Sequence, residues 1–184
     1  MRKMFFLFLF LPSILIAQSR DPIFRIGYFG ILGTHPGLKV GIEYPLSTFG
    51  ETEELNRQDQ ILASANLMLY FHRGNHIGLG TNLELGFRSR KLNRPNLELF
   101  GGFGYLWQIR SNRLYDFDAD ETIQLKHFYA QRYQLKTLGI GIGGNRSRNL
   151  EDDFWSIRPT LLHLKPFNTS TSYNFALDAS YLFR

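Results

Sequence analysis

Apolar and aromatic side chains alternate with small or polar ones along most of this chain, and this period of two limits the fold more than any other feature. The cleanest stretch is HIGLGTNLELGFRS, where Ile77 to Phe87 take every second position and Gly78 and Glu84 fall between them. Such alternation is typical of a β-strand with one apolar face, because a helix repeats every 3.6 residues instead. The sequence therefore predicts a chain built from strands.

About eight such segments occur, each close to the roughly ten residues that a tilted strand needs to cross a bilayer. They lie at residues 23–32, 38–46, 60–72, 76–89, 96–110, 133–143, 154–164 and 173–183. In the sixth segment the phase slips around residues 135–137, where we expect a β-bulge. Pro159 weakens the seventh segment as a strand, since proline cannot donate to a ladder. No linker or repeat divides the chain.

The first 17 residues, MRKMFFLFLFLPSILIA, differ from the rest. Arg2 and Lys3 precede an apolar run that ends at the small Ala17, a pattern typical of a secretory signal peptide. A single transmembrane anchor is the alternative, but the run is short and Pro12 interrupts it. We therefore predict a signal peptide at residues 1–17 and a single domain at residues 18–184.

The composition excludes several classes of function. The 184 residues include no cysteine, which removes thiolate zinc sites, iron–sulfur clusters and thiol nucleophiles. Loss of Arg2 and Lys3 with the signal peptide leaves 19 basic and 16 acidic residues, a net charge of +3 that is too small to indicate a nucleic-acid partner. After the signal peptide no stretch has 18 successive apolar residues, so a mature chain in a membrane must be a barrel.

Glycine indicates which face of the strands points inward. The polar face carries Gly27, Gly41, Gly78, Gly80, Gly86, Gly102, Gly104, Gly139, Gly141 and Gly143. The interior of an eight-stranded barrel is just wide enough for side chains, so the face pointing inward must be the smaller one. The predicted fold is therefore an all-β, antiparallel, up-and-down transmembrane β-barrel with about eight strands, apolar residues toward lipid and a polar, plugged interior. The alternative is a secreted soluble ligand-binding barrel.

This inner face carries equal numbers of charges of both signs. They are Arg25, Lys39, Arg88 and Arg158, and Glu43, Glu84, Glu98 and Asp178. An isolated ion in a confined interior costs several kcal/mol, so a balanced set predicts a paired network that fills the barrel. On the outer face, Tyr105, Trp107, Trp155 and Tyr173 are predicted to form aromatic girdles.

The closing segment, SYNFALDASYLFR, puts Tyr173, Phe175, Leu177, Tyr181 and Phe183 on its apolar face. With the alternation before it, the whole mature chain resembles the small outer-membrane β-barrel proteins of double-membraned bacteria. In that family a closing strand with terminal aromatics resembles the signal read by the barrel-insertion machinery, although here Arg184 follows the last aromatic. The resemblance implies a bacterial outer-membrane location, with membrane lipid and the insertion machinery as partners and a further protein partner in the envelope left open.

The termini are expected on the periplasmic side, with the connections at 33–37, 73–75, 110–131 and 166–171 outside. Within the longest of these, the segment ADETIQLKHFYAQRYQL fits a short helix or an extended hairpin arm equally well. The connection at 47–59 is unexpectedly long for the periplasmic side. Basic clusters at 88–94 and 146–148 are expected to hold interfacial positions.

Candidate chemistry is sparse. Asp116, Asp118, Asp120 and Glu121 begin like a calcium loop, but Glu121 and His127 stand where an EF-hand needs Gly and Glu, so a solvated acidic loop is favoured. The chain has five histidines: His35, His72, His76, His127 and His163. His72 and His76 flank a turn, but two ligands are too few for a zinc site, so we expect them to be turn residues in solvent.

Ser64, Ser156 and Ser180, with His163 and Asp178, are the candidates for nucleophilic catalysis. The outer-membrane lipid A deacylases carry a His-x-Ser triplet that this chain lacks, so we assign no catalytic, cofactor or metal site. The function favoured is a non-enzymatic outer-membrane barrel that stabilises the membrane, acts in adhesion or belongs to a larger assembly. A lipid-modifying barrel enzyme, acting on lipid A or phospholipid acyl chains, is the alternative.

Overall fold

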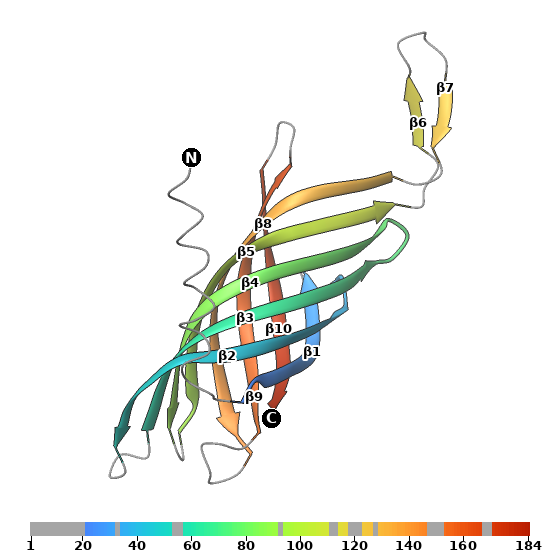
Figure 1. Cartoon of the computed structure of the whole chain (residues 1–184). Coiled ribbons are helices and arrows are strands. Elements are labelled where there is room, and N and C mark those ends of the chain that lie inside the picture. Colours follow the sequence, from blue (N-terminus) through green and yellow to red (C-terminus); the bar gives the residue numbers. More distant parts are fainter. Residues whose placement is uncertain are drawn as a thin grey trace, which may run out of the picture.

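The computed structural model describes residues 21–31, 34–52, 57–91, 94–110, 114–117, 123–126, 129–146, 153–166 and 171–184. The predicted signal peptide lies outside these residues. Eight strands form the barrel: β1 (Ile23–Ile31), β2 (Gly37–Thr52), β3 (Arg57–His72), β4 (His76–Lys91), β5 (Asn96–Arg110), β8 (Tyr129–Asn145), β9 (Phe154–Pro166) and β10 (Ser172–Phe183). Each pairs antiparallel with its neighbours, and β1 closes the ring against β10 (Figure 1). The predicted all-β, eight-stranded, up-and-down barrel is confirmed.

The barrel has two distinct ends. The connections that follow β1, β3, β5 and β9 meet at one end, which we call the mouth end, and the other end holds Asp21 and Arg184 (Figure 1). We call this second end the terminal end. The described part of the chain contains no helix with the length and apolar character of a membrane span.

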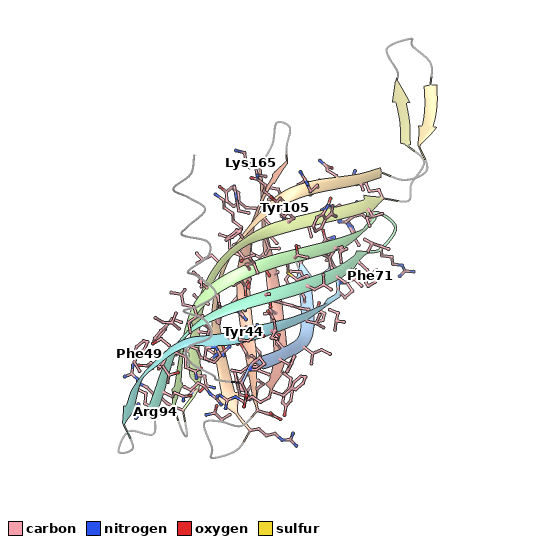
Figure 2. The ribbon with its side chains drawn as sticks, viewed as in Figure 1. Tyr44, Phe49, Phe71, Arg94, Tyr105 and Lys165 are labelled. Carbon is pink, nitrogen blue, oxygen red and sulfur yellow. The ribbon has the colours of Figure 1, made fainter. Side chains whose placement is uncertain are left out.

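Large apolar side chains cover the outside of the barrel on all eight strands. Tyr44, Phe71 and Tyr105 point away from it in Figure 2. Phe175 is 66% exposed and Leu83 is 56% exposed, values that a soluble core would not give to such residues. The predicted division of the strands into an outward apolar face and an inward glycine-bearing face therefore agrees with the structure.

Most strands are longer than the expected ten residues: β2, β3 and β4 have 16 each and β8 has 17. The predicted long connection at 47–59 is wrong for this reason. Ser47, Thr48 and Phe49 pair with β3, and Thr52 pairs with Arg57, so only residues 53–56 lie between the two strands. The segment expected to be a loop continues the β2–β3 hairpin, because its residues find ladder partners on β3.

The expected bulge near residues 135–137 is also wrong. The β5–β8 ladder runs without a shift from Asn96–Gly143 to Arg110–Tyr129, and the irregularities fall instead on β2, between Pro45 and Ser47 and between Phe49 and Thr52. The apparent phase slip arises because Leu135 points inward while Lys136 points outward. Pro159 lies within β9 and faces outward, and the β8–β9 pairing is interrupted between Thr160 and Ile157, where proline has no N–H to donate.

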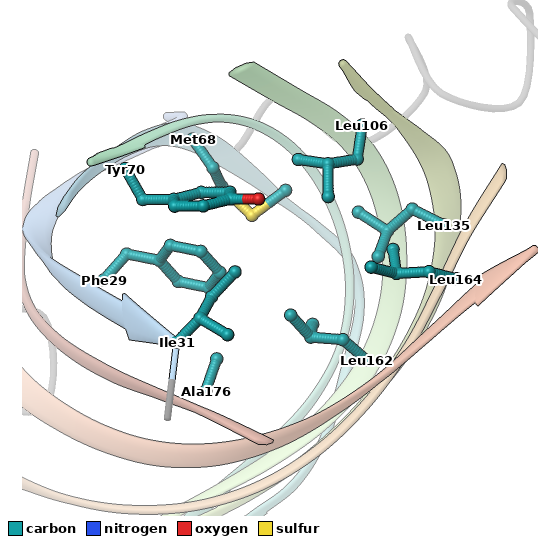
Figure 3. Close-up of a cluster of buried hydrophobic side chains, with 9 residues drawn as sticks. All are labelled: Phe29, Ile31, Met68, Tyr70, Leu106, Leu135, Leu162, Leu164 and Ala176. Atoms are coloured by element: carbon teal, nitrogen blue, oxygen red, sulfur yellow. The ribbon is translucent and has the colours of Figure 1, made fainter. Parts of the chain in front are cut away.

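Leu135 belongs to an apolar cluster inside the mouth end. The cluster comprises Phe29, Ile31, Met68, Tyr70, Leu106, Leu135, Leu162, Leu164 and Ala176 (Figure 3). A smaller cluster of Ile23, Phe154 and Leu182 lies at the terminal end. The sequence predicted a polar interior. In the structure the interior is not polar throughout but closes with apolar side chains toward both ends.

Two interior glycines show how the wall makes room for large inward side chains. A Cβ atom at Gly86 would overlap the ring of Phe100, and one at Gly139 would come 2.8 Å from Cδ of Arg158. Because both neighbours are inward-facing, the missing Cβ atoms relieve crowding inside the barrel. Gly101, on the outer face of β5, has only ordinary contacts.

Beyond the ends of β5 and β8, β6 (Leu114–Phe117) and β7 (Ile123–Lys126) form a separate two-stranded sheet (Figure 1). Of the two structures expected for this segment, the extended hairpin arm is correct for these residues. The predicted acidic loop lies largely outside the described residues, which do not include Asp118, Asp120, Glu121 or His127. For Asp116 the structure describes the backbone only.

Candidate functional site

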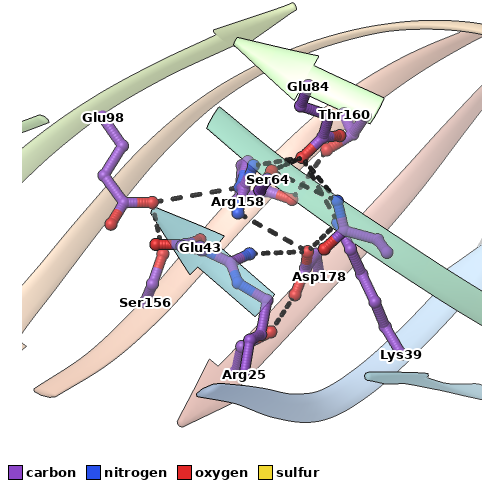
Figure 4. A network of polar contacts seen from close by, with 12 residues as sticks. Arg25, Lys39, Glu43, Ser64, Glu84, Glu98, Ser156, Arg158, Thr160 and Asp178 are labelled. Atoms are coloured by element: carbon purple, nitrogen blue, oxygen red, sulfur yellow. Dashed lines mark hydrogen bonds and ion pairs between the residues drawn. The ribbon is translucent and has the colours of Figure 1, made fainter. Parts of the chain in front are cut away.

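The eight charged residues predicted for the interior come together in one closed circuit of ion pairs. They are Arg25, Lys39, Glu43, Glu84, Arg88, Glu98, Arg158 and Asp178, from strands β1, β2, β4, β5, β9 and β10. Figure 4 labels all of them except Arg88. The strand register brings these residues together. Arg25 lies on β1, which pairs with both β2 and β10, and Arg88 lies directly opposite Glu98 on β5.

Cations and anions alternate around the circuit. Arg25 contacts Glu43 at 2.6 Å, Glu43 contacts Arg88 at 2.7 Å, and Arg88 contacts Glu98 at 2.7 Å. Arg158 links Glu98 at 3.9 Å to Glu84 at 3.1 Å. Lys39 links Glu84 at 3.8 Å to Asp178 at 2.8 Å, and Asp178 returns to Arg25 at 3.1 Å. Arg158 also contacts Asp178 at 3.9 Å, so each charge has at least two neighbours of opposite sign.

Neutral polar side chains add hydrogen bonds to three of the four carboxylates, those of Glu84, Glu98 and Asp178. Glu84 accepts hydrogen bonds from Asn82 at 2.8 Å, Asn66 at 3.2 Å and Thr137 at 3.3 Å. Ser156 donates to Glu98 at 2.7 Å, and Ser180 donates to Asp178. Burial of so many charges is tolerable only when each is paired and hydrogen-bonded in this way.

The charged circuit lies between the two apolar clusters. Along β1 the inward residues run from Ile23 to Arg25 to Phe29, and along β9 they run from Phe154 to Arg158 to Leu162. Both strands therefore pass from the terminal-end cluster through the charges to the mouth-end cluster. The interior is filled in layers, as expected for a plugged barrel.

Arg90 is a buried interior cation, so the interfacial position expected for the basic cluster at 88–94 is wrong for Arg90 and for Arg88. Its Nη2 atom donates to Asn145 Oδ1 at 2.9 Å, and its guanidinium lies 4.3 Å from the centroid of the Phe154 ring. Arg88 lies 4.6 Å from the same ring, and Arg158 lies 4.1 Å from the ring of Phe100. The alternation of β4 continues past Ser89, and this was the signal in the sequence that would have placed Arg90 inside.

The outer face holds the predicted girdle and closing-strand residues. Tyr105, Trp107 and Tyr173 lie toward the mouth end, and Trp155 lies toward the terminal end, where it pairs with Tyr181. Tyr173, Phe175, Leu177, Tyr181 and Phe183 all project outward from β10, and Phe183 stacks on Phe24 with the ring centroids 5.9 Å apart. The aromatic residues thus form two groups, one near each end.

The serine residues considered for catalysis do not meet the histidine considered with them. The hydroxyl groups of Ser156 and Ser180 donate to carboxylates of the charged circuit, and Ser64 donates to Glu84. His163 faces outward, with its ring centroid 4.8 Å from that of Tyr173. In the described structure these residues serve the interior network and the outer surface separately.

Three histidines gather at the mouth end, which differs from the expectation of solvated turn residues. His72 and His76 approach each other with ring centroids 5.0 Å apart, and His35, from the β1–β2 connection, lies 3.9 Å from His72. They line a cavity of about 320 Å³ together with Tyr70 and Arg110. Within the described residues no group of three or more His, Asp or Glu side chains is arranged to hold a metal ion.

Burial lowers the pKa of His76 to about 4, and the neighbouring His72, Arg110 and His35 act in the same direction. The imidazoles therefore share an electropositive environment at the rim of the barrel. Comparison with protein-family models, with curated proteins and with solved structures gave no match to this chain.

Proposed function

We propose that this chain is a non-enzymatic integral outer-membrane β-barrel protein, exported through a cleaved signal peptide at residues 1–17. Its role would be to stabilise the membrane, to act in adhesion or to form a subunit of an outer-membrane assembly. The observation that carries this proposal is the inverted distribution of side chains. Leu83, Ile140 and Phe175 are exposed, whereas Arg25, Glu43 and Arg88 are fully buried.

The apolar surface supports lipid as the surrounding medium. Water-soluble monomers rarely expose a continuous apolar patch of more than a few hundred Å². Here exposed apolar side chains occur on every strand of the ring, with Ile140 at 63% and Phe103 at 66%. In the closed ring each strand pairs with a neighbour on both sides, which is the condition for β-structure inside a bilayer.

The ends of the barrel support the same placement. The two groups of aromatic residues, around Trp107 and around Trp155, match the girdles that such barrels carry at both interfaces. The closing strand ends in outward aromatics, which supports recognition by the barrel-insertion machinery. Since both described termini share one end, we propose that this terminal end faces the periplasm and the mouth end faces outside.

The absence of native cysteine allows a direct test of the proposed location. Single-cysteine variants Ile140→Cys and Gln134→Cys lie on the outer face of the same strand, one among the apolar residues and one near the rim. In isolated membranes, a water-soluble maleimide should label the Gln134→Cys variant and leave the Ile140→Cys variant unlabelled. After detergent solubilisation both should react, which provides the control for folding and thiol reactivity.

Equal labelling of both cysteines before solubilisation would contradict the proposal, as would recovery of the protein in the aqueous fraction. Heat-modifiable migration in gels checks that the extracted barrel is folded. Labelling of Asn75→Cys in intact cells tests the orientation, because this residue lies in the β3–β4 turn at the mouth end.

The lipid-modifying alternative has its own test. Alanine replacement of Ser64, Ser156, Ser180 and His163 should leave the lipid A and phospholipid profiles of the cell unchanged if the barrel is not an enzyme. Loss of a modified lipid in the His163→Ala variant alone would favour the enzyme, since this side chain faces outward at the rim.

A further inference from the structure

Among the residues that the structure describes, no acidic side chain lines the cavity at the mouth end. Its ionisable residues are His35, Tyr70, His72, His76, Arg110 and Tyr133, and its other polar lining residues are Asn75, Gln108, Ser172 and Asn174. At about 320 Å³ it is close to the lower limit for small-molecule sites. A permanent positive charge from Arg110, with amide and imidazole donors and no carboxylate, favours a small anion over a cation.

A relay of hydrogen bonds leads from Tyr133 to Nε2 of His76. The Tyr133 hydroxyl donates to Gln108 Oε1 at 3.3 Å, and Gln108 Nε2 donates to the Tyr70 hydroxyl at 3.1 Å. The Tyr70 hydroxyl lies 3.3 Å from His76 Nε2, and its one proton is available for donation to that nitrogen. In that arrangement neutral His76 accepts at Nε2 and carries its own proton on Nδ1.

That Nδ1 atom is buried and has no hydrogen-bond partner, and the same holds for Nε of Arg110. His76 and Arg110 are direct cross-strand partners on β4 and β5. Two neighbouring donors without an acceptor are unusual in a folded protein, because buried N–H groups are nearly always paired. An oxyanion held between them would accept from both.

The neighbouring imidazoles suit the same ligand. The Nδ1 atom of His35 lies 3.0 Å from the backbone carbonyl of Ile31, to which it donates, and His72 lies between His35 and His76. The three rings do not form a metal-ligand arrangement within the described chain. His35 and His72 line the same cavity as His76 and Arg110.

From these contacts we propose that the mouth-end cavity binds a phosphate-type oxyanion, held by Arg110 and His76 with His35 and His72 beside them. The anion is either free phosphate or a phosphate group carried by a lipid headgroup. This inference goes beyond the proposed membrane function and does not depend on it, because the site lies on inward-facing side chains at the end of the ring.

The test is a calorimetric titration of the full-length purified protein with inorganic phosphate in dodecyl maltoside, a detergent without phosphate. We expect saturable binding that weakens about tenfold or more in Arg110→Gln and in His76→Gln, since each loses a charge-assisted or oriented hydrogen bond. His163→Gln is the matched control, because this histidine lies at the same end but faces outward against Tyr173. Should the protein prove water-soluble, the titration runs without detergent, so failure of the membrane proposal leaves this test intact.

A spectroscopic measurement covers the case in which a variant does not fold. In nitrogen-15 spectra of the unsubstituted protein, His76 should show the Nδ1–H tautomer, and its Nδ1 signal should shift on addition of phosphate. Tyr70→Phe removes the donor to Nε2 and should give a mixture of tautomers. A phosphate-insensitive His76 signal would overturn the proposal.

Two further arms identify the source of the anion. If nanodiscs of phosphatidylglycerol compete with inorganic phosphate and nanodiscs of phosphatidylcholine do not, the ligand is an anionic lipid headgroup. If neither lipid affects phosphate binding, the ligand is a free anion. Absence of phosphate binding to the unsubstituted protein overturns the proposal. So does zinc binding that depends on His76 in a protein that does not bind phosphate.

Discussion

Arg88 and Glu98 lie directly opposite each other on β4 and β5, and the Arg88 Nε atom donates to Glu98 Oε1 at 2.7 Å with both side chains fully buried. The same guanidinium contacts Glu43 at 2.7 Å through Nη2. One cation thus joins two carboxylates from different strands across the inside of the barrel. The pair is both a local cross-strand contact and part of the closed circuit, which makes it the most informative place to test that network.

Replacement of Arg88 by methionine should lower the free energy of unfolding by about 3–5 kcal/mol, because it leaves two carboxylates buried without their shared partner. Urea unfolding of the barrel in micelles or vesicles measures this change. Arg57→Met is the matched control: Arg57 contacts Asp59 at 2.6 Å, but its side chain is 40% exposed, so the loss should be much smaller. Similar small losses in both variants would show that the circuit contributes little to stability.

Gly86→Ala should destabilise the barrel by about 1–3 kcal/mol, because the added methyl group overlaps the inward ring of Phe100. Gly101→Ala on the neighbouring strand should have a much smaller effect, since a Cβ atom there meets only ordinary contacts. Denaturant unfolding again provides the measurement. Equal effects in the two variants would mean that backbone entropy, and not interior space, decides where glycine occurs.

Ile140→Arg should reduce stability in lipid vesicles by about 2–4 kcal/mol, the range for a cation near the bilayer midplane, if the outer face lies in hydrocarbon. Gln134→Arg, six positions earlier on the same face of β8, should cost about 0–1 kcal/mol because it lies near the rim. Folding into vesicles measured by gel migration distinguishes the variants. A harmless Ile140→Arg change would argue for a barrel surrounded by water.

The histidine cluster should make stability depend on pH. Burial and the adjacent His72, Arg110 and His35 lower the pKa of His76, at the β3–β4 turn, from 6.5 to about 4 in the folded protein. Between these values the unfolded chain binds more protons at His76 than the folded chain does, so this contribution to stability is lost as pH falls from about 6.5 toward 4. The comparison between unsubstituted protein and His76→Gln isolates this residue.

Urea midpoints measured for both proteins at several pH values between 7 and 4 would supply the data. The unsubstituted protein should lose more stability on acidification than His76→Gln, whereas the carboxylates affect both proteins alike. Parallel pH profiles would show that His76 titrates normally in the folded barrel.

The local sequence pattern was sufficient to predict the barrel and to predict which face of each strand points inward. A strand alternates its side chains with a period of two, so positions such as Ile77 and Gly78 reveal opposite faces wherever the pattern is unbroken. Glycine on the polar face then indicates the crowded interior. The eight charges of the circuit were identified in this way, because each lies in a segment whose phase could be followed from its neighbours, whereas buried Arg90 was not identified.

Contacts that depend on closure of the ring could be decided only by the tertiary structure. Arg25 and Asp178 meet because β1 pairs with β10, and Leu135 and Leu162 point inward because they complete a cluster supplied by other strands. The third histidine, His35, reaches His72 from a separate connection. Sequence alone determined which side of each strand is apolar, since that property belongs to neighbouring residues. Register and ring closure determined which inward side chains meet, since those relations join residues far apart in the chain.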